Sequence, residues 1–382
     1  MIRVAFVLQE PTPYRTPHLA RLAAHPELEV LVVYASRTVQ RRTWTIEDDG
    51  AIFLSGPTFP LARVLHHDFA LTPGVWPLLR RLRPDLVVVG GWSVLATQLA
   101  ILWCRTHRVP YLLMSDSHLR EPRPQWAGAV KRAILPHIVP QAAGWLVPGT
   151  LARRHLAAYG ADERRTAVFP LTVDVAELSA RADAQRDQRD DARAAFGIAP
   201  QAVAILGVGR LVPFKAPDLL VRAASRARAT SGVPLHLVLT GDGPLEDDVR
   251  ALARKEGLPA TFTGLLEGDD LLRVYVAADV FALLSRREPW GVVVNEAMCC
   301  GLPLVLTQAV GAAEDLLEPG GNGLLVPSGD VEAAADAIAT LAADTTLRHA
   351  FGERSRQLIS TWGYEESIEA FVRLAREVTA ER

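Results

Sequence analysis

The stretch from Val280 to Thr307, VFALLSRREPWGVVVNEAMCCGLPLVLT, contains the structural unit that repeats along the chain. Its two ends, Val280–Leu284 and Leu304–Thr307, are apolar at every position except Thr307, which is typical of strands covered on both faces. Between them a Pro-Trp-Gly turn leads into an apolar helix, Val292–Cys300, which Gly301 caps. A buried strand, a helix and a second buried strand predict a parallel pair joined by a helical crossover.

The same alternation continues in both directions from this stretch. Before it, strands are expected at Ile2–Leu8, Glu29–Tyr34, Leu86–Gly91, Tyr111–Ser115, Gly144–Val147 and Thr166–Phe169. It resumes with strands at Val203–Gly207, His236–Thr240 and Ala260–Thr263, and the end of the chain, Asp330–Ala380, is expected to be helical. The charged segment Ala180–Ala195 between the two series is interpreted as a solvated helix or loop.

We therefore predict an α/β protein with two Rossmann-like, doubly wound domains, residues 1–172 and 173–361. A chain of 382 residues is too long for one ordinary core, which agrees with two domains. Ligands of such sheets bind at the carboxyl ends of the strands, so a cleft between the domains is the expected site.

Composition excludes several classes of function. The net charge of −2 gives no reason to expect a nucleic-acid partner. Three cysteines, Cys104, Cys299 and Cys300, form neither a disulfide framework nor a metal-binding spacing. The start, MIRVAFVLQEP, is interpreted as a strand and not a signal peptide, and no apolar run reaches the length of a membrane span. A cytoplasmic protein is expected, and a peripheral contact with the inner membrane surface stays open.

The first candidate loop is Ile205–Leu220, ILGVGRLVPFKAPDLL, in which a strand leads through Gly209 to Arg210 and Lys215. Glycine allows a ligand close to the backbone, and the two cations suit a phosphate. Val212 occupies the place of the third glycine, so this is not the dinucleotide fingerprint. A polar turn with two surface cations is the alternative.

A second loop carries Gly241, Asp242 and Gly243 after a strand, a tight turn that feeds a helix with Pro244 at its first position. Alone it predicts only a turn. Its place at a strand end puts it on the same edge of the sheet as the first loop.

The third loop contains two acids, Glu288 and Glu296, on either side of a helix start. The backbone N–H groups near Pro289, Trp290, Gly291 and Val292 are expected to form an anion site. Acids beside a phosphate suit hydroxyl groups, and a nucleoside diphosphate sugar has a ribose on one side of the diphosphate and a hexose on the other. An acid favoured by the helix dipole and an ordinary helix acid are the alternative.

These residues resemble the family 4 glycosyltransferases, retaining enzymes of the GT-B fold. Glu288 and Glu296 match the E-x7-E motif of that family with its spacing intact. The resemblance runs from about Ala202 to Asp330, and its other matching segments are Gly209–Lys215, Gly241–Pro244, Ala277–Val280, Glu296–Pro303 and Asn322–Pro327.

The resemblance implies a role for each matching residue. Arg210 and Lys215 would hold the diphosphate and stabilise its charge as it leaves, Glu296 would bind the ribose hydroxyls, and Glu288 the hydroxyls of the donor sugar. It also implies that no metal or other cofactor is needed, and that a final helix, residues 362–382, returns to the first domain. Asp190-Asp191 and Asp269-Asp270 are expected on surface segments, and adjacent histidines such as His66-His67 point apart in most backbones, so none of these pairs is expected to bind a metal.

The first half of the chain departs from the family pattern. Prolines replace the glycines of the first loop, and Tyr14 and Arg15 are acceptor-side candidates there, with a rigid loop as the alternative. After the strand ending at Ser115 the usual His-Asp or His-Gly pair is absent, so His118 or Asp116 is the candidate for the catalytic histidine role.

Trp92 and Ser93 follow another strand and are also acceptor-side candidates. A packing role at the rim of the site is the alternative for Trp92.

The resemblance implies a retaining hexosyltransferase that acts by metal-independent front-face substitution. The expected donor is a nucleoside diphosphate sugar, with UDP favoured over GDP by prevalence in the family. The expected acceptor is a hydroxyl of a glycan, a lipid-linked saccharide of polysaccharide biosynthesis or a specialised metabolite. A sugar-nucleotide 2-epimerase of the same fold and a non-catalytic sugar-nucleotide sensor are the alternatives, and the sequence does not predict the oligomeric state.

Overall fold

The computed structural model describes all of the 382 residues except 38–49, 60–68, 119–124 and 382. The chain divides into two compact units. Unit 1 comprises the described residues up to Thr172 together with those from Tyr364 onward. Unit 2 comprises Val173–Gly363, so the chain passes from one unit to the other twice.

Unit 1 is built on a parallel sheet in the order β3-β2-β1-β6-β7-β8-β9. Its strands are β1 (Ile2–Leu8), β2 (Leu28–Tyr34), β3 (Ile52–Phe53), β6 (Leu86–Gly90), β7 (Tyr111–Met114), β8 (Gly144–Val147) and β9 (Thr166–Val168). A separate two-stranded sheet pairs β4 (Thr58–Phe59) antiparallel with β5 (Phe69–Ala70). Apart from Arg3 near the start of β1, the central strands β1, β6 and β7 are apolar, as expected for a sheet whose two faces are covered by helices.

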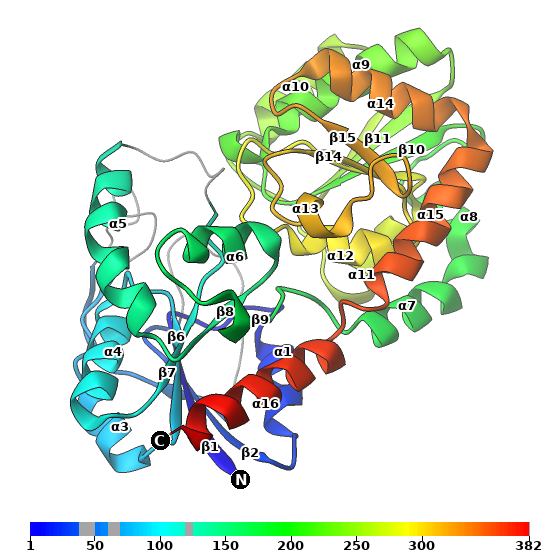
Figure 1. The fold of residues 1–382 in the computed structure, drawn as a ribbon. Coiled ribbons are helices and arrows are strands. Elements are labelled where there is room, and N and C mark those ends of the chain that lie inside the picture. Colours follow the sequence, from blue (N-terminus) through cyan, green and yellow to red (C-terminus); the bar gives the residue numbers. More distant parts are fainter. Residues whose placement is uncertain (38–49, 60–68, 119–124, 382) are drawn as a thin grey trace. The chain divides into compact units, whose positions relative to one another are not determined.

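Each face of the first sheet has its own layer of helices (Figure 1). One layer contains α3 (Val75–Leu82), α4 (Leu95–His107), α5 (Gln125–Ile138) and α6 (Thr150–Ala157). The other contains α1 (Thr16–Ala23) and the last helix of the chain, α16 (Tyr364–Ala380). Residues from the end of the sequence thereby complete the core of the unit that contains its start.

A buried histidine connects α1 to α16. The imidazole of His18 stacks between Phe169 and Tyr364, with ring centroids 4.2 and 4.5 Å away. Its Nε2 lies 2.7 Å from the hydroxyl of Ser367, which itself donates to the Tyr364 carbonyl, so Nε2 carries the proton. Burial, with a smaller contribution from nearby Arg15, lowers the pKa of His18 to about 3.

Unit 2 is built on a second parallel sheet, in the order β12-β11-β10-β13-β14-β15. Its strands are β10 (Val203–Val208), β11 (Leu235–Thr240), β12 (Ala260–Gly264), β13 (Val280–Leu283), β14 (Leu304–Thr307) and β15 (Gly323–Val326). The order reverses between β10 and β13, because β11 and β12 follow β10 on one side while β13, β14 and β15 extend on the other.

Helices also cover the second sheet. The helices α9 (Pro217–Ser231), α10 (Glu246–Lys255), α14 (Val331–Ala343) and α15 (Thr345–Ile359) share one apolar core with the strands. The remaining helices of this unit are α7 (Val175–Ala184), α8 (Arg189–Ala195), α11 (Gly268–Ala277), α12 (Val292–Cys299) and α13 (Ala313–Leu316).

The predicted α/β class with two Rossmann-like sheets is confirmed, and several details of the prediction need correction. The charged segment Ala180–Ala195 is helical, but Arg193 is only 5% exposed and pairs with Asp279 at 2.9 Å, so the segment is not simply solvated. Helix α10 begins at Glu246, which leaves Pro244 in the preceding turn. The final helix begins at Tyr364 and not at residue 362.

Candidate functional site

The candidate residues of unit 2 lie where the strand order of its sheet reverses. Lys215 follows β10 and Glu288 follows β13, and these two strands are neighbours that head opposite halves of the sheet. In open parallel sheets this reversal leaves a crevice outside the carboxyl ends of the strands, and ligands bind there. The topology therefore brings together two residues that are 73 positions apart in the sequence.

The glycine loops after β10 and β11 contact each other through their backbones. Gly209 donates its N–H to the Thr240 carbonyl at 2.9 Å, and Leu211 donates to the Asp242 carbonyl at 2.6 Å. A Cβ on Gly241 would lie 2.3 Å from the Gly209 carbonyl oxygen, and Gly241 also has a φ of +128°. Gly243 is equally restricted, since a Cβ there would lie 2.5 Å from the Leu211 carbonyl oxygen. Both positions require glycine for close approach of the two loops.

Lys215 and Glu288 form an ion pair at this edge of the sheet. Their side chains are only 20% and 11% exposed, so the charges are poorly screened by water. The backbone of Phe214 fixes the pair in register, because its carbonyl accepts N–H bonds from both Arg286 (2.8 Å) and Arg287 (3.2 Å). The sequence predicted that both residues bind donor groups, and the structure brings them into direct contact.

The turn after Glu288 is held by its own backbone. Gly311 donates to the Glu288 carbonyl at 2.9 Å, and Ala312 donates to the Trp290 carbonyl at 3.0 Å. Gly291 adopts a φ of +97° and caps α12, whose first N–H groups have no partner within the helix. These N–H groups follow Glu288 directly, at the carboxyl end of β13.

Trp290 and Pro289 were expected among the donor-binding residues, and the structure limits what Trp290 can offer. Its indole is 2% exposed, donates Nε1–H to the Asn295 side chain at 3.2 Å and packs against Trp362 with ring centroids 5.7 Å apart. The side chain therefore supports the turn, and contact with a ligand would come from the backbone.

Glu296 occupies the second turn of α12 and is partly buried. Its Oε2 accepts a hydrogen bond of 2.6 Å from the phenol of Tyr275, which lies on α11. Burial raises the pKa of the Glu296 carboxyl to about 7, and the hydrogen bond from Tyr275 opposes this shift. Burial, and after it the charge of Glu296, raise the pKa of Tyr275 well above its ordinary value. Tyr275 could not be found from the sequence, because its partner is 21 positions away on another helix.

Arg210 follows Gly209 and has an exposed side chain. Within the part of the chain that the structure describes, its guanidinium has no hydrogen-bond or ion-pair partner, whereas the ammonium group of Lys215 pairs with Glu288. It is therefore accessible to an anion without first breaking an internal contact.

The acceptor-side candidates of unit 1 flank the corresponding reversal of the first sheet. Tyr14 and Arg15 belong to the loop after β1, and Trp92 and Ser93 follow the neighbouring strand β6. Tyr14, Arg15 and Trp92 are partly buried, and Ser93 is exposed. Trp92 packs against the apolar core, and its carbonyl accepts from the Gln98 amide at 3.1 Å, which agrees with the packing alternative.

His118 and Asp116 follow β7, the next strand in the sheet. Asp116 is exposed, whereas His118 is only 2% exposed. Ser117 lies between these two residues in the sequence, and its hydroxyl accepts a hydrogen bond of 3.3 Å from Lys131. The structure therefore separates the two candidates for the histidine role, with Asp116 open to solvent and His118 enclosed.

The described residues contain no group of three or more His, Cys, Asp or Glu side chains arranged to hold a metal ion. Asp190, Asp191, Asp269 and Asp270 are exposed, as predicted. His66 and His67 lie outside the described residues. No described helix is long and apolar enough to cross a membrane.

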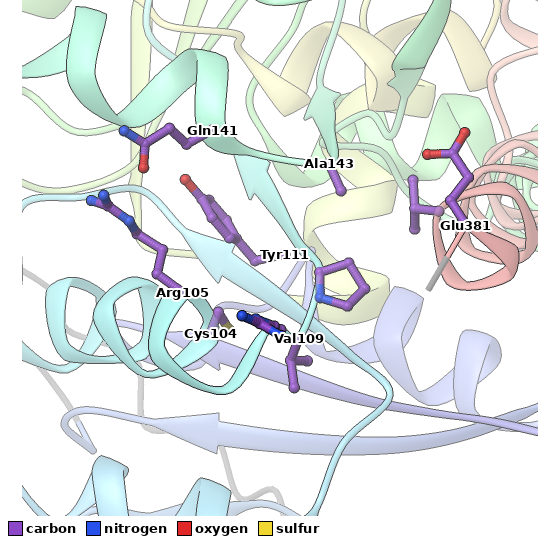
Figure 2. Close-up of a pocket in the computed structure, with 10 residues that line it drawn as sticks. Cys104, Arg105, Val109, Tyr111, Gln141, Ala143 and Glu381 are labelled. Carbon is purple, nitrogen blue, oxygen red and sulfur yellow. The ribbon is translucent and has the colours of Figure 1, made fainter.

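A pocket of about 300 Å³ lies elsewhere in unit 1 (Figure 2). Tyr111 at the start of β7 and Ala143 just before β8 line it, together with Arg105 and Gln141. These residues lie at the amino ends of the strands. The pocket is thus separate from the loops after β1, β6 and β7, which lie at the carboxyl ends.

Two family models match successive parts of the chain. The model described as Glycosyltransferase Family 4 matches residues 18–177, and the model described as Glycosyl transferases group 1 matches residues 188–358. Together with the strand-end loops described above, these matches establish that the chain belongs to the family 4 glycosyltransferases, of the GT-B type.

Curated relatives agree with this family. The chain is 28% identical over 338 residues to a sulfoquinovosyl transferase of Arabidopsis thaliana, which covers 86% of this chain and 63% of the relative. It is 36% identical over 202 residues to a D-inositol 3-phosphate glycosyltransferase of Saccharomonospora viridis, which covers 50% of this chain and 47% of the relative. The chain thus spans about half to under two thirds of the length of these relatives.

Solved structures show the same fold. Anabaena HepE in complex with UDP superposes with a TM-score of 0.72 at 18% identity, covering 100% of this chain and 99% of that one. A sucrose-phosphate synthase of Thermosynechococcus elongatus gives 0.74 at 19% identity, covering 100% of both chains. Both are similar to this chain in fold.

Proposed function

We propose that this protein is a retaining glycosyltransferase that moves a hexose-type sugar from a nucleoside diphosphate sugar to an acceptor hydroxyl. The observation that carries the proposal is the Lys215–Glu288 ion pair at the reversal of the second sheet. It places a cation suited to phosphate beside an acid suited to sugar hydroxyls, next to the N-terminus of α12.

The donor site comprises residues of unit 2 only. Arg210 and Lys215 bind the diphosphate, together with backbone N–H groups at Gly209 and at Gly291–Val292. Gly241 and Gly243 allow the loop after β11 to approach, Glu288 accepts from the hexose, and Glu296 accepts from the ribose. UDP is the preferred nucleotide of the donor, which agrees with the UDP bound to Anabaena HepE.

Transfer proceeds by front-face substitution. The bond from the anomeric carbon to the diphosphate oxygen breaks while the acceptor oxygen bonds to the same face of that carbon, so the configuration is retained. The acceptor proton passes to the leaving phosphate oxygen. Arg210 and Lys215 stabilise the charge on the diphosphate as preorganised cations, and the step therefore needs no metal ion.

The acceptor is a hydroxyl-bearing glycan, lipid-linked saccharide or specialised metabolite, bound by unit 1. Tyr14, Arg15, Trp92 and Ser93 are the acceptor-side residues, and Asp116 or His118 takes the histidine role of the family. The name of one relative includes D-inositol 3-phosphate, so a phosphorylated polyol belongs in any acceptor screen.

We place the protein in the cytoplasm, and a peripheral contact with the inner membrane surface is the alternative to a solvated end of α3. Arg80, Arg81 and Arg83, at the end of α3, are exposed and could meet an anionic surface. Flotation with vesicles containing phosphatidylglycerol tests this contact. Failure of the protein to float with the vesicles would remove the contact and leave the enzymatic proposal intact.

The test of the function is donor binding and slow donor hydrolysis in the presence of a chelator. Purified protein is incubated with UDP-, GDP-, ADP- and dTDP-sugars, and saturation transfer and sugar release are followed by NMR. We expect the protein to bind one nucleotide sugar. The sugar that hydrolysis releases should first appear with the same anomeric configuration as in the donor, as retention requires.

Variants assign that signal to the site. Lys215→Ala and Glu288→Ala should lose binding, while Arg226→Ala, which removes an exposed ion pair to Glu332 in the same unit, should keep it. Binding with no transfer to any acceptor or water would favour a sensor, and a changed sugar in the nucleotide product would favour the 2-epimerase. No binding of any nucleotide sugar would overturn the donor site.

A further inference from the structure

One buried phenol contacts the candidate ribose-binding acid directly. Tyr275 on α11 is 2% exposed, and its ring lies 6.2 Å from that of Phe281 on the central strand β13. Its hydroxyl donates to Glu296 Oε2 at 2.6 Å. The ring is enclosed by the core, so the hydroxyl is held in one place.

We propose that Tyr275 is a positioning residue for the donor: its phenol holds one carboxylate oxygen of Glu296 so that the other oxygen accepts from the ribose. The proposal rests on the proposed function. It assigns to the donor site a residue that does not touch the donor.

The chemistry of the pair supports this division of roles. A phenol donates one hydrogen bond, and a carboxylate can accept several, so occupying Oε2 leaves Oε1 available. Among the described residues, Oε1 of Glu296 has no hydrogen-bond partner. A carboxylate held in one orientation loses less conformational freedom when the ribose binds than a freely rotating one does.

The same hydrogen bond affects the charge of Glu296. It stabilises the carboxylate and thereby counteracts the effect of burial on its pKa. Loss of the phenol hydroxyl should raise the pKa of Glu296 further, so that a larger fraction is protonated at neutral pH. Removal of the hydroxyl would therefore disturb both the orientation and the ionisation of the acid.

The test is a cycle that combines one protein change with one ligand change. Binding of UDP, GDP and their 2′,3′-dideoxy analogues is measured by calorimetry from pH 6 to pH 9 for the wild type and for Tyr275→Phe. We expect Tyr275→Phe to bind the preferred nucleotide about tenfold more weakly at pH 7, as fits loss of a hydrogen bond to a charged group. The affinity for the dideoxy analogue should differ little between Tyr275→Phe and the wild type. For the preferred nucleotide, the pH at which binding is half maximal should be higher in Tyr275→Phe.

Tyr111→Phe is the matched control, because it removes the hydroxyl of another buried tyrosine, which donates to the Ile138 carbonyl at 2.9 Å in unit 1. It should bind nucleotides like the wild type. Equal affinity of Tyr275→Phe and wild type for the preferred nucleotide, or equal losses for both ligands, would overturn the positioning role and leave the proposed function intact. A wild type that binds neither UDP nor GDP would overturn both.

Discussion

Glu296 has a pKa close to neutral pH because its carboxyl is desolvated in the fold. The folded protein therefore keeps a proton that the unfolded chain releases near pH 4.5. This contribution to the free energy of unfolding is complete below that pH and is lost as the pH rises through about 7. The loss is between about 1 and 3 kcal/mol, allowing for partial exposure of the residue.

Urea denaturation from pH 5 to pH 8 measures this effect. Glu296→Gln cannot ionise, so its free energy of unfolding should decline less with pH than that of the wild type. Glu332→Gln, at an exposed position on α14, should follow the wild type. Parallel pH profiles for Glu296→Gln and the wild type would contradict the assignment.

Lys215 and Glu288 should depend on each other for stability. Lys215→Met leaves a poorly exposed carboxylate without its cation, which should cost about 1–3 kcal/mol of unfolding free energy. Adding Glu288→Gln should recover most of this loss, because the double variant also lacks the negative charge that Lys215 offsets in the wild type. Nucleotide-sugar binding should not return with stability, since both ligand contacts are absent. Denaturation and calorimetry on the single and double variants distinguish the two effects.

Among individual residues, the sequence predicted those that belong to motifs and not those that support them. The spacing of Glu288 and Glu296, and the cations in the loop after β10, were visible in the sequence. Tyr275, Arg193 and His18 were not, because each acquires its role from a partner on a distant element. Spacing along one segment contains no information about such pairings.

The glycine loops of unit 2 allow a prediction at the scale of elements. Gly241→Ala should separate the loops after β10 and β11, since its Cβ would overlap the Gly209 carbonyl. We expect a loss of at least about 2 kcal/mol in unfolding free energy, together with loss of nucleotide binding. Gly232→Ala is the control, because that residue also has a positive φ, of +67°, but a Cβ there would contact nothing. If both variants bind nucleotide equally well, the loop contact is not needed for binding.

Buried strands such as β8 and β14 were predicted with their observed bounds, because each is an almost continuous apolar run. Helices α5 and α6 and strand β15 were not predicted. Strand β15 has only four residues and lies at the edge of its sheet, where Leu325 is exposed, so its short apolar run did not distinguish it from a loop. Helix α5 contains Pro136, which ordinarily indicates a break in a helix.

For the whole molecule, the buried His18 between α1 and α16 predicts that acid destabilises unit 1. His18 is neutral in the fold with its pKa lowered to about 3, so the unfolded chain binds more protons between about pH 6.5 and 3. Stability from this group is complete above pH 6.5 and is lost as the pH falls through that range, opposite in sign to Glu296. The total contribution of His18 to the free energy of unfolding is at most about 5 kcal/mol.

Hydrogen exchange of the backbone amides in α1 and α16, measured as the pH is lowered, tests this acid sensitivity. His18→Gln keeps a side-chain N–H donor without a titrating group, so its exchange in these helices should change less between pH 7 and pH 4. Exchange in α9 of unit 2 serves as the internal control. Equal acid sensitivity of His18→Gln and wild type in α1 would contradict the role of His18.

The double passage of the chain between units has a consequence for biosynthesis. Phe371 and its neighbours on α16 cover one face of the first sheet, and they emerge from the ribosome only after all of Val173–Gly363. At roughly 5–20 residues per second, those 191 residues (363 − 173 + 1) take about 10–40 s to synthesise. During that interval the nascent first unit exposes an apolar sheet face, while the unit begun later can complete its folding first.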